Sequence, residues 1–77
     1  MSLFFFHVRD GSTTIDGEGV DLPDLDSARR EAIVACGEIL RDVPAAIWNG
    51  HTLLLWVTDQ PHGQGNTLFS LNVSPAR

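Results

Sequence analysis

The feature that most limits the possible folds of this 77-residue chain is a single segment with helical periodicity. It lies between two groups of short β-type segments. Small and apolar residues recur there at three- and four-residue spacing: Leu25, Ala28, Ala32, Cys36, Ile39 and Val43. The spacing predicts one amphipathic helix of roughly 18 residues. Asp24 is the expected N-cap, because its carboxylate can accept hydrogen bonds from free backbone N–H groups of the first turn. Pro44 should end the helix. The small-residue ridge of Ala28, Ala32 and Cys36 should let the helix lie close to a sheet.

The remaining apolar segments have the alternation and the turn residues of short β-strands. Four strands are predicted, at residues 3–8, 14–22, 51–58 and 67–73. Asp10-Gly11 should turn the first strand into the second, and Gly17 and Gly19 predict a bulge or an edge position in the second. The polar residues Asp59 to Asn66 are the expected hairpin loop. The order β-β-α-β-β predicts a single α+β domain over residues 1–77, with a four-stranded, mostly antiparallel sheet and one amphipathic helix on one face.

One helix can cover only one face of this sheet, so strand alternation divides the apolar residues into two sets. The set expected to face the helix is Phe4, Phe6, Val8, Leu55, Val57, Phe69 and Leu71. The opposite, second face carries the predicted interface residues Phe5, His7, Leu54, Trp56 and Leu68. This set is too apolar for a face fully in water, so a homodimer, or a complex with another protein, is expected there. Alternatively, the loop Gln60 to Asn66 or the segment Pro44 to Asn49 folds over that face.

The charge balance is acidic, with ten Asp and Glu residues against five Arg and no Lys, and a net charge of −5. This argues against binding to nucleic acid or anionic membranes, which requires a concentrated positive surface. A single cysteine excludes an internal disulfide and a Cys-based zinc site, and no cofactor is predicted. No apolar stretch approaches the roughly 20 residues of a membrane span, and residues 1–6 lack the basic start of a secretory signal. A cytoplasmic protein is therefore expected.

Few residues point to catalytic or metal-binding chemistry. His7 could act as a general base with Asp10, or with Asp16 across the hairpin. The sequence supplies no evident nucleophile or oxyanion loop, so His7 is expected to pack and to form hydrogen bonds on the second face. Cys36 is expected in the core. No known metal-site spacing matches that of His51, Asp59 and His62.

Four short motifs together resemble a known family. They are F-F-H-V-R-D-G at residues 5–11, E-G-V-D-L-P-D-L at 18–25, A-R-R-E-A at 28–32 and V-T-D at 57–59. The combination is similar to a family of small uncharacterised bacterial proteins with a domain of unknown function. The resemblance implies the same fold and a bacterial cytoplasmic origin. It implies no activity, cofactor or catalytic residue.

Three classes of function follow from these observations. The favoured class is a small non-enzymatic interaction or regulatory module that self-associates through the second face. The second is an acidic mimic or inhibitor that binds a basic site on a partner protein through the carboxylates of Asp16, Glu18, Asp21, Asp24 and Asp26. The third is a small enzyme that uses His7 and Asp10.

Overall fold

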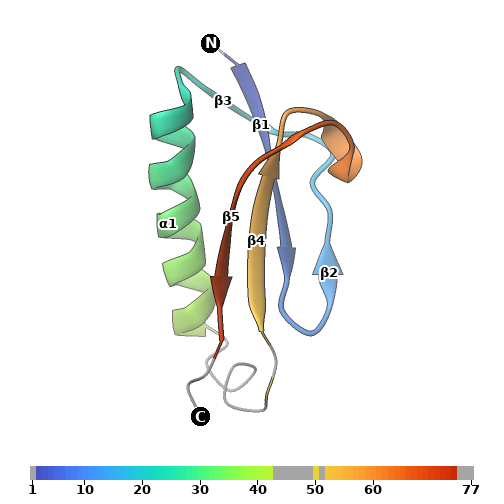
Figure 1. Ribbon diagram of the computed structural model, residues 1–77. Helices are drawn as coiled ribbons and strands as arrows, with labels where there is room; N and C mark the ends of the chain where they lie inside the picture. Colours follow the sequence, from blue (N-terminus) through green and yellow to red (C-terminus); the bar gives the residue numbers. More distant parts are fainter. Residues whose placement is uncertain (1, 43–49, 51, 75–77) are drawn as a thin grey trace.

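The computed structural model describes residues 2–42, 50 and 52–74 and places one helix against one face of an antiparallel sheet (Figure 1). The elements, in chain order, are β1 (Ser2–Arg9), β2 (Thr13–Thr14), β3 (Val20–Leu22), α1 (Leu25–Asp42), β4 (Leu53–Thr58), the 3₁₀ turn η1 (Pro61–Gly63) and β5 (Thr67–Val73). Across the sheet the order is β2-β1-β4-β5, and β3 also pairs with β1. The predicted α+β architecture is confirmed, with five strands described in place of four.

The predicted second strand, residues 14–22, is the source of the additional strand. It is divided into β2 and β3, which pair antiparallel with opposite ends of β1. Residues 15–19 leave the sheet between them, and both Gly17 and Gly19 lie in this interruption. The strand breaks there because the Asp16 carboxylate, instead of a strand carbonyl, accepts a backbone N–H of β1. The predicted edge position is therefore confirmed, and the irregularity is a break in place of a bulge.

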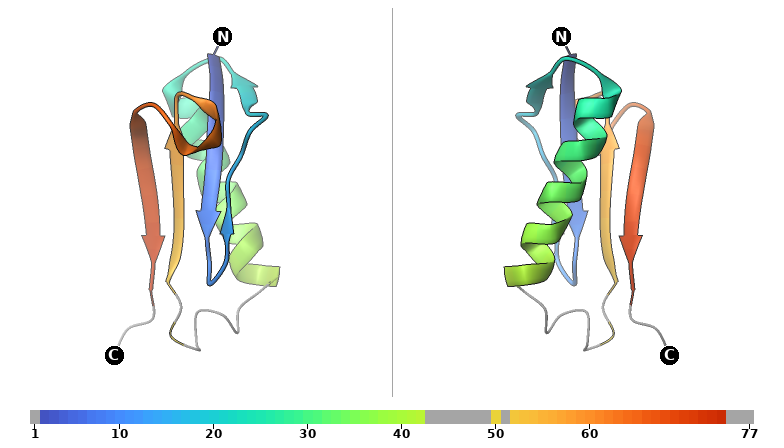
Figure 2. Two further views of the ribbon diagram at one scale, coloured as in Figure 1. Left: turned by 90° about the vertical axis from the view of Figure 1, so that its right-hand side faces the viewer. Right: turned by 90° about the vertical axis from the view of Figure 1, so that its left-hand side faces the viewer.

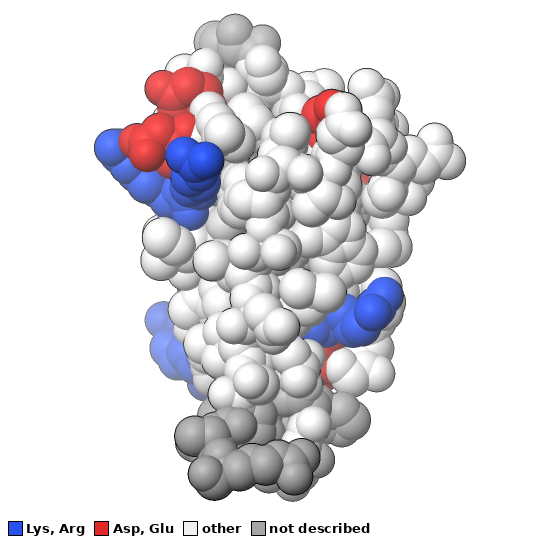
Figure 3. All heavy atoms as spheres, viewed as in Figure 1, with Lys and Arg blue, Asp and Glu red and all other residues white. Residues whose placement is uncertain are grey.

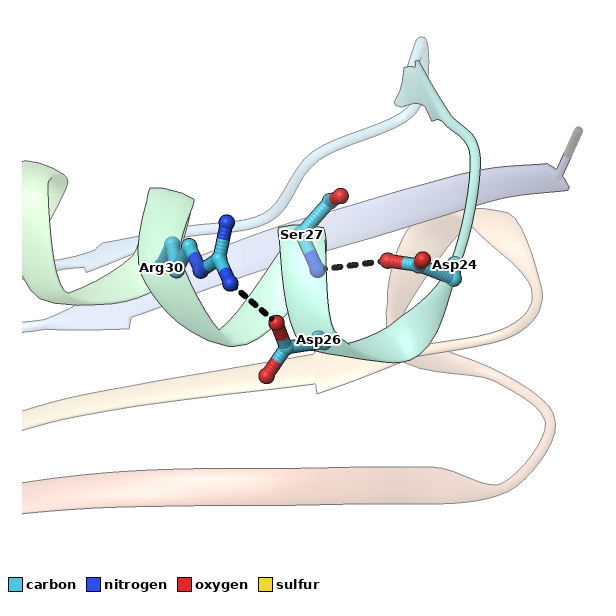
Figure 4. Close-up of polar contacts among 4 residues, drawn as sticks. All are labelled: Asp24, Asp26, Ser27 and Arg30. Carbon is cyan, nitrogen blue, oxygen red and sulfur yellow. Dashed lines mark hydrogen bonds and ion pairs between the residues drawn. The ribbon is translucent and has the colours of Figure 1, made fainter.

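The start of α1 is capped as predicted. The carboxylate of Asp24 accepts a hydrogen bond from the backbone N–H of Ser27 at 2.8 Å (Figure 4). This bond holds the pKa of the Asp24 carboxyl below its usual range. One turn further on, Arg30 pairs with Asp26 at 2.7 Å on the exposed surface, where such pairs contribute little to stability (Figure 4). The expected end of the helix at Pro44 lies outside the described residues.

The strands after the helix agree with the predicted hairpin. β5 spans the predicted residues 67–73, and β4 is described from Leu53. His51, where this strand was expected to begin, lies outside the described residues. Within the part of the chain that the structure describes, no helix combines the length and hydropathy needed to cross a membrane.

The core lies between α1 and the sheet (Figure 2, right). The small-residue ridge is buried, and it packs with three β4 side chains that have no exposed surface: Leu53, Leu55 and Val57. The other predicted helix-facing residues pack around them, namely Phe4, Phe6, Val8, Phe69 and Leu71. Burial raises the pKa of the Cys36 thiol, so this side chain stays protonated in the core. The predicted division of the strands into two faces is thus confirmed on the helix side.

Enlarging the small-residue ridge is expected to destabilise the fold. Ala32 has no exposed surface, so Ala32→Leu must displace α1 or the β4 side chains, with a loss of about 1–3 kcal/mol. Cys36→Phe should act in the same way. Urea or thermal unfolding measures the loss, and Glu38→Leu on the exposed side of α1 is the control, with an expected change within about 0.5 kcal/mol. Unchanged stability of both ridge variants would contradict this packing.

Candidate functional site

One end of the second face is covered by the chain's own loops. The turn η1 lies over one end of β1 and β4, as the left panel of Figure 2 shows. Residues 15–19 close the same end, where Gly19 lies against Phe5. Phe5 and His7 are therefore buried, with 5% and 0% of their surface exposed. These two predicted interface residues are interior positions, because residues 15–19 and the loop Gln60 to Asn66 together cover this end. The alternative cover, Pro44 to Asn49, lies outside the described residues.

His7 is held by hydrogen bonds at both ring nitrogens. Its Nδ1 accepts the backbone N–H of Asp16 at 3.0 Å. The ring proton is therefore on Nε2, which donates to Thr58 Oγ1 at 2.8 Å. The Thr58 hydroxyl in turn donates to the carbonyl oxygen of Gln60 at 2.7 Å. These bonds join β1, residues 15–19 and the β4–β5 loop, and they fix the tautomer of His7.

The electrostatics of this site favour a neutral histidine. Burial lowers the pKa of His7 below its usual value. The Asp16 carboxylate opposes this effect, because a nearby negative charge favours the protonated ring, while His62 acts in the same direction as burial. Protonation would also place a second N–H at Nδ1, directed at the N–H of Asp16. Acid should therefore disrupt this contact.

Asp16 organises the segment that covers His7. Its carboxylate accepts three backbone N–H groups, those of Phe6 (3.1 Å), Glu18 (2.9 Å) and Gly19 (3.1 Å). Its carbonyl oxygen accepts the N–H of His62 at 2.9 Å. Phe6 belongs to β1 and lies beside the gap between β2 and β3, where its N–H would otherwise have no strand partner. Asp16 thus connects β1, its own segment and η1.

The charge of Asp16 is stabilised by these contacts. Burial alone would raise the pKa of its carboxyl, but the backbone N–H groups of Glu18, Gly19 and Phe6 outweigh burial and lower the pKa. Proximity to His7 acts in the same direction as the hydrogen bonds. The carboxylate is therefore ionised at neutral pH, while the adjacent imidazole is neutral.

Two glycines let residues 15–19 lie close to their neighbours. A Cβ at Gly17 would lie 2.6 Å from His62 Cε1, and a Cβ at Gly19 would lie 2.7 Å from Phe5 Cε1. Gly19 also has a φ of 80°, in the left-handed region that favours glycine. The run Asp16-Gly17-Glu18-Gly19 therefore combines a carboxylate acceptor with two positions of close approach.

The other end of the second face is left open by these loops (Figure 2, left). Leu54 and Trp56 are half-buried there. Leu68 lies instead beside Val57 and Thr58, in the β-bulge at the start of β5, and is 37% exposed. The Arg9 guanidinium carbon lies 5.8 Å from the centre of the Trp56 ring, and the His7 ring centre lies 5.2 Å from it. Leu54 and Trp56 form the open patch, and with Leu68 they are what remains exposed of the predicted interface.

A family model described as a domain of unknown function, DUF6894, matches residues 3–74. The chain belongs to the DUF6894 family. The matched range contains α1, the His7 network and the open patch. No curated protein and no solved structure gives a significant match to the chain.

Of the two carboxylate residues predicted as partners of His7, Asp10 and Asp16, only Asp16 contacts the ring in this DUF6894 chain. No hydrogen bond joins His7 to Asp10, whose carboxylate accepts the Ser12 hydroxyl at 3.4 Å. Asp16 contacts the ring instead, through its backbone N–H. Thr58, with 1% of its surface exposed, was not singled out from the sequence. A signal was present, because a hydroxyl on an apolar, alternating strand requires a hydrogen-bond partner when buried.

Two further features bear on ligand binding by this DUF6894 chain. A shallow groove of about 690 Å³ lies beside η1 and is lined by Ser2, Leu3, Phe5, Gly17, Glu18, Asp59, Gln60 and Pro61. The Asp59 carboxylate in this lining accepts both N–H donors of Asn66, backbone at 2.8 Å and side chain at 3.3 Å. Across residues 2–42, 50 and 52–74, the His, Cys, Asp and Glu side chains form no group of three that could hold a metal ion.

Proposed function

We propose that this DUF6894 protein is a small non-enzymatic interaction or regulatory module that self-associates through the open patch on the second face. The proposal rests on the position of Trp56, which lies half-buried on a sheet face whose neighbouring end is closed by the chain's own loops. Complete burial of a large apolar side chain contributes about 1.5–3 kcal/mol, and part of this gain is still available at Trp56.

The chemistry around Trp56 is suited to a protein partner. Trp and Arg are enriched among the residues that dominate binding energy at interfaces, and Arg9 lies against the Trp56 ring. Ser70 and Asn72 of β5 lie opposite Trp56 and Leu54 and supply a polar border. An apolar centre with a polar rim is the usual anatomy of an interface.

The proposed partner is a second copy of this chain. Two-fold dimers are the commonest assemblies of soluble proteins. The net charge of −5 on each copy opposes association, but salt screens repulsion beyond about 8 Å at physiological ionic strength. Arg9 at the patch also places a positive charge where the two acidic chains would meet.

Two other functions receive less support from the geometry. An acidic mimic would present to a basic partner the carboxylates of Asp16, Glu18, Asp21, Asp24 and Asp26. Three of these already bind within the chain, two as acceptors of backbone N–H groups and one in an ion pair. A small enzyme would use His7 and Asp10, but the His7 side chain is buried and both of its ring nitrogens are engaged.

Self-association is expected to depend on Trp56. Sedimentation across a concentration series should show assembly at high micromolar protein, and Trp56→Glu should weaken it by about tenfold or more, because an interfacial tryptophan contributes about 2 kcal/mol. The control is Ile33→Glu, which places the same charge at a 63% exposed residue of α1 and should leave assembly unchanged. A wild-type chain that stays monomeric at these concentrations would refute the proposal.

We also propose a bacterial cytoplasmic setting for the protein. The motif resemblance supports the bacterial origin, and the single buried thiol of Cys36 is compatible with a reducing compartment. Fractionation of the source cells tests this setting, and recovery of the protein outside the cytoplasm would contradict it.

A further inference from the structure

β5 forms one edge of the sheet, and its outer side has no strand partner among the described residues. The opposite edge is different. There the two- and three-residue strands β2 and β3 are separated by residues 15–19, so little continuous backbone is open to pairing. β5 is seven residues long, and after the β-bulge at its start it follows β4 in regular register from Phe69 to Val73, which leaves a continuous row of backbone groups at its outer side there.

Strand alternation shows which β5 residues direct their backbone groups outward. Phe6 donates its N–H to Asp16 on the β3 side of β1, so the next residue, His7, directs its backbone groups toward β4. His7 lies opposite Trp56, and the neighbouring β4 residues therefore direct theirs toward β5. These β4 residues, Leu55 and Val57, lie opposite Leu71 and Phe69, whose backbone groups therefore face β4. The N–H and C=O groups of Ser70 and Asn72 then point away from the sheet.

Beyond the β-bulge at its start, the β5 edge lacks the features that commonly prevent strand pairing. Exposed edges are usually protected by charged residues, proline, bulges or a short length, and Thr67–Val73 contains neither a charged residue nor a proline. Figure 3 looks onto this edge and shows uncharged surface along β5, with the visible Asp, Glu and Arg side chains around it. In an acidic chain of this size, such an uncharged edge permits another acidic chain to approach.

The helix-facing side chains of β5 are also incompletely covered. Phe69, Leu71 and Val73 are only half-buried, whereas the β4 residues opposite them have no exposed surface. The right panel of Figure 2 shows the reason, because α1 crosses the β1 side of the sheet and leaves the β5 side beside it. A strand added outside β5 would bury more of these three side chains.

We infer that β5 is a second self-association surface, at which β5 of another copy pairs antiparallel and continues the sheet. A two-fold axis at Leu71 makes the pairing self-complementary. Ser70 and Asn72 then exchange hydrogen bonds with Asn72 and Ser70 of the other copy, and Phe69 packs beside the other copy's Val73. The occupant is a second copy because each strand supplies the uncharged, apolar surface that the other requires. This surface is the backbone edge of β5, whereas the open patch around Trp56 is a side-chain surface on the second face, and the two adjoin at Ser70 and Asn72.

The experiment uses the Trp56→Glu chain, in which association through the open patch is weakened by about tenfold or more. Sedimentation at high micromolar protein should still show a dimer. Adding Ser70→Pro removes the outward N–H without removing a β4–β5 hydrogen bond, and should weaken this dimer by about tenfold or more. Adding Ser70→Ala keeps the N–H and is the matched control, with the dimer retained. Circular dichroism verifies that each variant is folded.

Hydrogen exchange in the Trp56→Glu chain gives a readout that does not depend on the proline variant folding. Exchange at the Ser70 and Asn72 amides should slow as protein concentration rises, whereas it should not change at exposed amides of α1. A monomeric Trp56→Glu chain, or amide exchange at these two residues that is independent of concentration, would overturn the β5 inference. If wild type still associates in that case, the open-patch proposal stands alone.

Discussion

Replacing Asp16 by alanine is expected to lower the free energy of unfolding by about 3–6 kcal/mol, since each of its two part-buried hydrogen bonds, from the N–H groups of Phe6 and Gly19, contributes about 1.5–3 kcal/mol. The change removes the acceptor of three backbone N–H groups, one of them in β1. Each of these donors is held where no strand carbonyl replaces the carboxylate. A domain of this size has a total stability of about 4–12 kcal/mol, so the loss is a large fraction of it.

Urea unfolding followed by circular dichroism measures this effect. Asp21→Ala is the matched control, because Asp21 is an exposed carboxylate on the adjacent β3, and its loss should change stability by about 0.5 kcal/mol or less. Asp16→Asn retains one carbonyl acceptor and should give an intermediate loss, which keeps the test informative if Asp16→Ala fails to fold. Equal stability of the Asp16→Ala and Asp21→Ala chains would contradict the role assigned to Asp16.

Replacing His7 by alanine is expected to cost about 2–4 kcal/mol, from the cavity and from the unpaired groups that it leaves. The ring has no exposed surface. Its removal leaves the N–H of Asp16 without its acceptor and Thr58 Oγ1 without the N–H that it accepts. Urea unfolding again measures the loss. A change in the free energy of unfolding below about 0.5 kcal/mol would show that the ring does not hold residues 15–19 and the β4–β5 loop in place.

The same histidine should make stability depend on pH. Above pH 6.5 the ring is neutral in both the folded and the unfolded chain, so the stability is fully present. Because burial lowers the pKa of His7 in the folded state, the unfolded chain binds a proton first as the pH falls below 6.5. The free energy of unfolding should therefore decrease as the pH falls from 6.5 to the lowered pKa of His7 in the folded chain. Above pH 6.5 the contribution of His7 should remain constant.

His7→Gln separates this titration from the packing of the side chain. Glutamine can still donate to Thr58 but carries no titratable group, so the decrease below pH 6.5 should become smaller than in wild type. His62→Gln is the control, because it removes the exposed histidine that lies over Gly17 and should leave most of the decrease in place. A His7→Gln chain with the wild-type pH profile would contradict the assignment.

The sequence by itself determined α1, the strands β1, β4 and β5, and the helix side of the core. The Asp24 cap and the ridge of Ala28, Ala32 and Cys36 depend on residues three or four positions apart, within reach of one helical turn. The faces of β1, β4 and β5 follow from alternation, which each strand carries in its own residues. Such short-range relations were sufficient to predict which side chains α1 covers.

Only the tertiary structure decided what lies over the second face. Alternation placed Phe5 and His7 on it, but their burial depends on η1 and on the segment around Asp16, whose paths are not encoded in strand periodicity. His7 and Thr58 are 51 positions apart and form their hydrogen bond only when β1 and β4 pair. The break between β2 and β3 likewise forms because the Asp16 carboxylate can satisfy a β1 amide once the chain has folded back. Contacts of this kind are set by the packing of distant segments, and local sequence patterns do not determine them.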